Sequence, residues 1–134
     1  MVYMKQETKK QILERCGGLS KPSKMPCYSY NIPATACALG SILREIKGST
    51  CSDCYAMKGR YIFKNVRDAM QRRLRLIYTD LPYWIESMVA AIERVETSGY
   101  FRWHDSGDIQ SLEHLSAINE IALRLPRVKL WLPT

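Results

Sequence analysis

The chain has 134 residues, enough for one domain with a single hydrophobic core. A hydrophobic content of 46% excludes a disordered chain, and no stretch is long and apolar enough to span a membrane. The net charge of +7 favours anionic partners such as nucleic acid, and the polar first 15 residues lack the apolar region of a secretion signal. We therefore expect a cytoplasmic protein without a membrane partner.

The first elements are short. Residues 8–16 predict a helix that stops at Gly17 and Gly18, and a loop rich in proline follows. Residues 27–32 are rich in tyrosine and predict the first strand. We interpret residues 1–24 as an N-terminal helix and loop, and residues 25–134 as one α/β domain.

Two longer helices are predicted next, after a connection at residues 34–50 that holds one or two helical turns. The first covers residues 65–78, with its apolar residues on one stripe: Val66, Met70, Leu74 and Ile77. The second runs to about residue 95, because Asp80 is a good N-cap and Pro82 suits the first turn.

The last third of the chain predicts strands at residues 100–104 and 128–132 around a helix at residues 112–125. Leu115, Ile118 and Ile121 would form the apolar side of this helix. The alternation of strands and helices predicts a parallel sheet with helices packed on it. Because the chain stops directly after a strand, we expect a truncated domain, or a second copy that covers the last strand.

Three cysteines indicate a metal centre. Five cysteines and no export signal argue against paired disulfides. Cys51 and Cys54 are separated by two residues, and Cys37 lies upstream; thiolates suit zinc or an iron–sulfur cluster. The one-plus-two spacing favours a [4Fe–4S] cluster, with Cys27 as a possible fourth ligand. A closed zinc site that uses a fourth cysteine or His104 is the alternative. Cys16 is more simply a buried thiol.

Three motifs resemble a known family. They are Cys-Ser-Asp-Cys-Tyr-Ala-Met-Lys-Gly-Arg-Tyr at residues 51–61, Phe-Arg-Trp-His-Asp-Ser-Gly-Asp at 101–108, and Trp-Leu-Pro-Thr at 131–134. Over residues 25–134 the chain resembles the bacteriophage "gene product 88" family, which has no settled activity. Members are longer, which implies that this chain is truncated. Their phage origin implies that the protein acts in the host-cell cytoplasm.

A wider likeness is to radical SAM iron–sulfur enzymes, and it implies an incomplete parallel β/α barrel. In these enzymes an aromatic residue stands beside the last cluster cysteine, as Tyr55 does here, and a Gly-Gly-Glu-like turn holds S-adenosylmethionine. Ser106, Gly107 and Asp108 resemble that turn. The long interval between Cys37 and Cys51 departs from the usual spacing. Catalytic residues are not identified, and we do not expect this chain alone to be active.

Two further groups have a functional and a structural interpretation. His104, Asp105 and Asp108 follow a strand, where α/β proteins place ligands, but Asp108 or Ser111 is also a good helix cap. Basic residues crowd one segment between aromatic ones: Lys58, Arg60, Lys64, Arg67, Arg72, Arg73 and Arg75. Such a helix can bind nucleic acid, although a solvated surface is the more common role. Alternative functions are therefore a zinc-stapled nucleic-acid-binding module and a non-catalytic electron-transfer or structural cluster protein.

Overall fold

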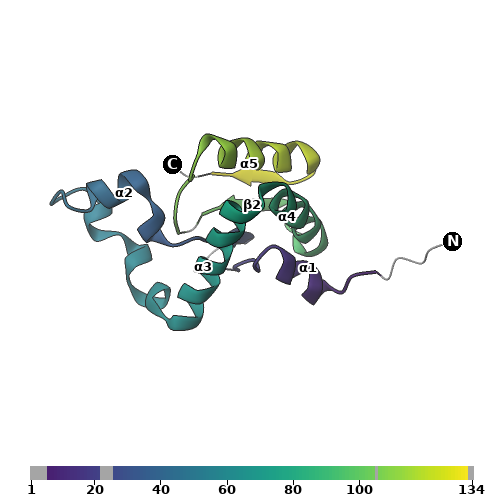
Figure 1. The fold of residues 1–134 in the computed structure, drawn as a ribbon, viewed down its shortest axis with the longest axis horizontal. Coiled ribbons are helices and arrows are strands. Elements are labelled where there is room, and N and C mark those ends of the chain that lie inside the picture. Colours follow the sequence, from purple (N-terminus) through teal and green to yellow (C-terminus); the bar gives the residue numbers. More distant parts are fainter. Residues whose placement is uncertain (1–5, 22–25, 105, 133–134) are drawn as a thin grey trace.

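A small parallel sheet forms the centre of the protein. The computed structural model describes residues 6–21, 26–104 and 106–132 (Figure 1). Strands β1 (Tyr28–Tyr30), β2 (Tyr100–Trp103) and β3 (Lys129–Trp131) pair in the order β1-β2-β3, all parallel. The predicted parallel α/β architecture is confirmed. The barrel-like part of that prediction is not, because the described strands form an open sheet of three short strands, too few to close.

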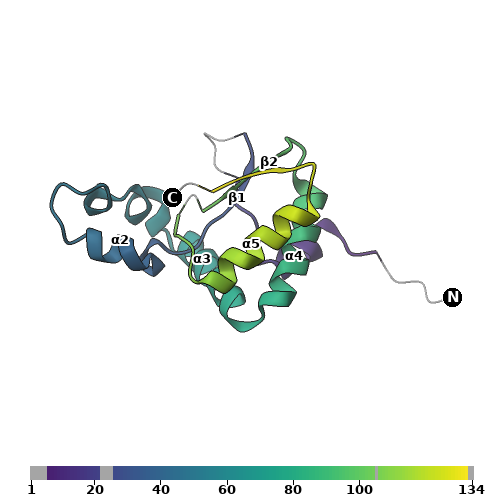
Figure 2. The ribbon, with the colours of Figure 1, turned by 90° about the horizontal axis from the view of Figure 1, so that it is seen from above.

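Three helices lie on one side of this sheet (Figure 2). They are α3 (Lys64–Thr79), α4 (Leu81–Val95) and α5 (Leu112–Arg124). Asp80 caps α4 by accepting a hydrogen bond from the backbone N–H of Tyr83 at 3.1 Å, as predicted. Where the structure is described, no helix is both long and apolar enough to cross a membrane.

The core lies between the sheet and these helices, and aromatic rings fill it. The ring of Trp84 on α4 lies 5.7 Å from the ring of Tyr30 and 5.8 Å from that of Trp103. Ile118 and Ile121 of α5 are buried as predicted, but Leu115 is 40% exposed. That part of the helix prediction is wrong, because buried His114 and Ala117 take the inward positions instead.

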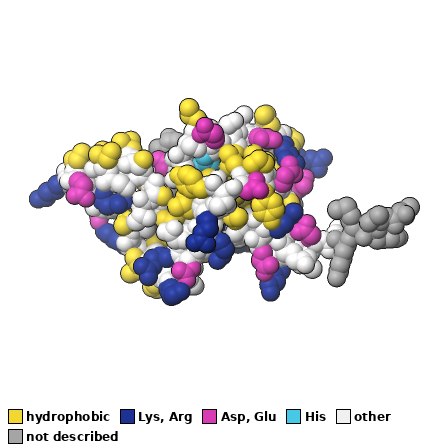
Figure 3. Space-filling view, viewed as in Figure 1, with side chains coloured by type: hydrophobic (Ala, Val, Ile, Leu, Met, Phe, Trp, Pro, Cys, Tyr) yellow, Lys and Arg dark blue, Asp and Glu magenta, His cyan; other side chains and the backbone are white. Residues whose placement is uncertain are grey.

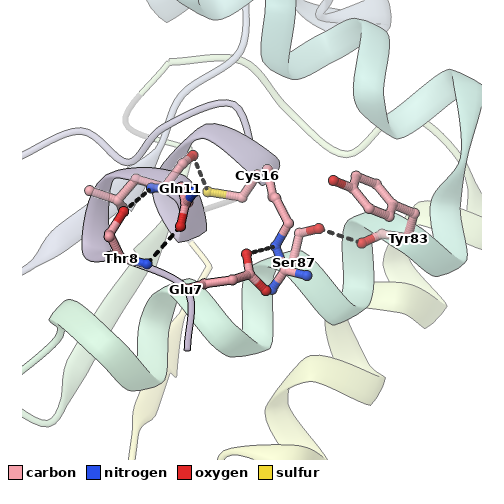
Figure 4. A network of polar contacts seen from close by, with 8 residues as sticks. Glu7, Thr8, Gln11, Cys16, Tyr83 and Ser87 are labelled. Atoms are coloured by element: carbon pink, nitrogen blue, oxygen red, sulfur yellow. Dashed lines mark hydrogen bonds and ion pairs between the residues drawn. The ribbon is translucent and has the colours of Figure 1, made fainter. Parts of the chain in front are cut away.

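The N-terminal helix α1 (Lys9–Arg15) packs against α4 and is fixed by a capping box (Figure 4). Thr8 and Gln11 exchange hydrogen bonds at its start. At its end the Cys16 thiol donates to the Leu13 carbonyl at 3.2 Å, and the Cys16 carbonyl accepts from the Tyr30 hydroxyl at 2.7 Å. Cys16 is therefore part of the core, as expected for a buried thiol.

Residues 34–63 form a lobe that extends away from the sheet, and we call it the cysteine lobe (Figure 1). It consists of helices of one or two turns: η1 (Ala34–Ala36), α2 (Ala38–Leu43), η2 (Thr50–Asp53), η3 (Tyr55–Met57) and η4 (Gly59–Ile62). Its buried hydrophobic side chains, as far as they are described, are only those of Ala34 and Ala56. Large hydrophobic side chains lie on its surface instead (Figure 3), including Leu39, Ile42, Ile46, Ile62 and Phe63. The cysteine lobe therefore lacks a core of its own.

Candidate functional site

The candidate site lies where the chain leaves the carboxyl ends of β1 and β2. The backbone N–H of Ile32 donates to the Ser106 carbonyl at 3.1 Å, which holds the two exits side by side. The Gln110 side chain donates to the Ala36 carbonyl at 3.2 Å and joins the second exit to the start of the cysteine lobe. This edge of a parallel sheet is where α/β proteins usually bind ligands.

Cys37 and Cys51 approach each other across Gly40. Cys37 precedes α2 as its N-cap, and Cys51 lies in η2. A Cβ atom placed on Gly40 would lie 3.9 Å from the Cys37 sulfur and 3.7 Å from the Cys51 sulfur. It would also lie 3.0 Å from the Cys37 Cβ, which is too close without a shift. Gly40 therefore keeps open the space beside both thiols. The sequence analysis missed this residue, whose signal is a glycine three positions after Cys37.

Cys54 and Asp108 complete this group. Burial is the main cause that raises the pKa of the Cys37 thiol above its usual value. The Asp108 carboxylate and the Cys54 and Cys51 sulfurs raise this pKa further, whereas the Arg44 guanidinium lowers it. Each of these groups is thus near enough to Cys37 to interact with it electrostatically. The three predicted thiols therefore lie in the same part of the cysteine lobe, with Asp108 near Cys37.

Short-range hydrogen bonds hold the cysteine-bearing turns. The Ser49 hydroxyl accepts from the Ser52 backbone N–H at 3.1 Å and donates to the Leu43 carbonyl at 2.5 Å. Lys58 pairs with Asp53. Across the described ranges, no three His, Cys, Asp or Glu side chains are already grouped to hold a metal ion. A bound metal would therefore require the three thiols to close further.

Cys27 lies at the amino end of β1, opposite to the end at which the candidate site lies. It comes directly before β1, whereas Cys37 follows the carboxyl end of that strand, and each strand residue adds about 3.3 Å. Burial raises the pKa of the Cys27 thiol, and nearby Glu96 raises it further. The same Glu96 accepts a hydrogen bond from the backbone N–H of Tyr28 at 2.8 Å. Because the strand separates Cys27 from Cys37, Cys51 and Cys54, we omit it from the ligand set.

The turn after β2 is packed against the exit of β1. Gly107 has φ +89°, and a Cβ there would lie 2.2 Å from Ile32 Cγ1 and 2.8 Å from the Ile32 carbonyl oxygen. The glycine is thus required by packing against Ile32. Ser106 is buried, and Ser111, not Asp108, caps α5 through the His114 backbone N–H at 3.0 Å. Of the three residues predicted to bind a cofactor, Asp108 interacts electrostatically with Cys37. Asp105 lies outside the described residues.

His104 and His114 form a buried pair whose rings are 5.5 Å apart. His104 has φ 57°, a conformation that residues other than glycine rarely adopt. Its Nδ1 lies 3.1 Å from the Tyr30 carbonyl, and burial lowers its pKa. Burial also lowers the pKa of His114, to about 4, and its Nδ1 accepts from the Gln110 backbone N–H. Both rings are therefore neutral near pH 7, and the sequence analysis missed His114.

Much of the basic segment has a structural role. Arg73 is buried and donates to the carbonyls of Gly18 at 2.9 Å and Asn31 at 3.2 Å. Arg72 donates to the Gly17 carbonyl at 3.2 Å, and Lys64 pairs with Asp68 at 2.6 Å. These contacts reduce the number of cations that α3 offers to a polyanion.

Comparison with models of protein families gives a match over nearly the whole chain. The family described as gene product 88 matches residues 2–134, a range that includes the motifs at residues 51–61 and 101–108. No curated protein and no solved structure matches the chain. None of the three comparisons supports the likeness to radical SAM enzymes.

Proposed function

The chain belongs to the gene product 88 family of bacteriophage proteins, and we propose that it binds a [4Fe–4S] cluster through Cys37, Cys51 and Cys54. The observation that carries this proposal is the position of the three thiols in a lobe without a core. Segments of this size fold stably when a disulfide or a metal supplies what the hydrophobic core cannot. All five cysteines are free thiols, which leaves them available to a metal centre.

The donor set fits a cluster better than a single zinc ion. A structural zinc site needs four ligands at about 2.0–2.3 Å around one point. The cysteine lobe holds three cysteines, and Cys27, the predicted fourth ligand, lies at the opposite end of β1. A cubane cluster is wider than one ion, so its ligands need not converge on one point. Three cysteines would leave one iron open to a non-protein ligand.

Asp108 suggests what such a ligand would carry. Its carboxylate lies near enough to Cys37 to raise the pKa of that thiol, so it suits a positively charged group such as an amine. The amino group of S-adenosylmethionine is one candidate, and the cluster would then supply reductive radical chemistry. Asp108 would bind and orient the ligand, and Arg44 would offset part of the negative charge of the thiolates.

Single cysteine variants test the proposal, with a matched control in the same chain. Cys37→Ser, Cys51→Ser and Cys54→Ser should each lower the iron and sulfide content of the anaerobically reconstituted protein by more than half. Cys27→Ala should keep the wild-type content, provided that circular dichroism shows it to be folded. Equal iron and sulfide content in all four variants would overturn the assigned ligand set. Loss of iron and sulfide in Cys27→Ala alone would move the site to the amino ends of the strands.

Asp108→Asn tests the ligand separately. This variant should bind a normal amount of cluster because it keeps Cys37, Cys51 and Cys54. It should then show a smaller change in the EPR spectrum when S-adenosylmethionine is added to the reduced protein. A wild-type spectrum that does not change on addition would exclude S-adenosylmethionine and favour a structural or electron-transfer cluster.

A further inference from the structure

The face of β2 and β3 that points away from the helices carries an ordered set of four side chains. Tyr100 pairs with Lys129, and Arg102 pairs with Trp131, in the register of the two strands. Directly paired residues project from the same face of a sheet, so all four share one surface. Figure 2 shows α3, α4 and α5 on the opposite side. We call this set the open sheet face.

Aromatic and cationic residues alternate on the open sheet face, both along each strand and across the pair. The Arg102 guanidinium lies 5.1 Å from the centre of the Trp131 ring, and the Lys129 ammonium lies 5.8 Å from that of Tyr100. Trp131 is 52% exposed and Tyr100 is 49% exposed. Two large rings thus face solvent. The core contains Phe101 and Trp103 of β2 instead.

We propose that the open sheet face binds single-stranded nucleic acid, with Trp131 and Tyr100 stacking on bases and Lys129 and Arg102 binding phosphates. Exposed aromatic residues on a sheet are a recurrent platform for bases, and each stacked base contributes substantially to affinity. Neighbouring cations neutralise the backbone, and the net charge of +7 complements a polyanion. The proposal is independent of the cluster, because none of the four residues belongs to the cysteine site.

The charges on this face disfavour a second copy of the chain as its partner. A second copy would bring its own Lys129 and Arg102 against the same two cations, and like charges at an interface repel. On the basic helix α3, Arg72 and Arg73 donate hydrogen bonds to backbone carbonyls and Arg73 is buried, so fewer of the cations of this helix are available to a polyanion.

Binding should be measured by fluorescence anisotropy with fluorescein-labelled 12-mers of oligothymidine and oligouridine at low salt. Trp131→Ala should weaken binding roughly tenfold or more, because it removes a stacking platform. Lys129→Ala should weaken binding several-fold and lower the salt slope by about 1. Two controls match these changes elsewhere: Tyr83→Ala removes an exposed ring from α4, and Arg75→Ala removes an exposed charge from α3. Both controls should stay within about twofold of wild type.

Tryptophan fluorescence provides a second measurement. Trp84 and Trp103 are fully buried, so quenching of tryptophan emission by an oligonucleotide would report on Trp131. Trp131→Phe should keep most of the binding and lose the quenching. Tighter binding of one oligonucleotide would identify RNA or DNA as the preferred form.

Three results would overturn the proposal. One is no binding at low salt, and another is weaker binding in Arg75→Ala but not in Trp131→Ala, which would move the site to α3. The third is a dimer in sedimentation that Trp131→Ala converts to a monomer, which would identify a second copy as the occupant.

Discussion

Gly40 provides a sharp test of the cysteine site. Adding one methyl group at this position should change the stability of the protein little but should strongly weaken cluster binding. In Gly40→Ala the new Cβ would lie 3.0 Å from the Cys37 Cβ, so its neighbour must move by a few tenths of an ångström. This crowding opposes the gain of about 1 kcal/mol that alanine brings to a helix. The free energy of unfolding of the metal-free protein should therefore change by less than about 1 kcal/mol.

Cluster binding should respond much more strongly to the same change. The methyl group would stand 3.7 Å from the Cys51 sulfur and 3.9 Å from the Cys37 sulfur, where the thiols must close around the cluster. Disturbing the surroundings of metal ligands typically lowers affinity roughly 10- to 100-fold.

The assay is iron and sulfide per chain after anaerobic reconstitution, with thermal unfolding of the metal-free protein measured in parallel. Leu39→Ala, an exposed position of the same helix, is the control and should load normally. Normal loading of Gly40→Ala would refute the assigned geometry.

Three further predictions follow from packing, burial and the lobe. Gly107→Ala should destabilise the protein by about 3 kcal/mol in chemical denaturation, because its Cβ would meet Ile32 at 2.2 Å. Gly48→Ala, with a similar φ of +88° and open space around it, should cost only about 1 kcal/mol, and equal costs would argue against the packing role. The His114 pKa of about 4 lies below its unfolded value of about 6.5. The unfolded chain therefore takes up the proton first, and about 3 kcal/mol of stability should be lost as pH falls from about 6.5 to 4. His114→Asn should flatten that loss, and an unchanged pH profile would contradict it. Removing the metal with a chelator should make residues 34–63 the first site of trypsin cleavage; identical digestion of both forms would show that the lobe needs no metal.

The elements of the sheet and helices were predictable because their ends carry strong local signals. Asp80 and Pro82 start α4, and the observed helix ends at Val95, as predicted. Pro126 and Gly99 mark boundaries in the same way. Periodicity was a poorer guide to orientation: α5 turns His114 inward and leaves Leu115 partly exposed, because a neutral histidine can pack as an apolar ring.

The site was predictable only in part, because the spacing of residues along the sequence does not show which of them lie close together in the fold. Cys37, Cys51 and Cys54 were selected from their chemistry and spacing alone. Cys27 lies at the amino end of β1, away from the site at the carboxyl end, and this follows from the strand direction in the assembled sheet. The role of Gly40 depends on the separate turn that carries Cys51. The buried Arg73 looked like part of a surface patch, because its carbonyl partners, Gly18 and Asn31, are more than 40 residues away.

The most direct test of the central claim is the metal and sulfide content of the wild-type protein prepared without oxygen. The proposal predicts a brown protein with broad visible absorption and about four iron and four acid-labile sulfide atoms per chain. A colourless protein with one zinc ion and no sulfide would contradict it, and so would a protein that binds neither metal.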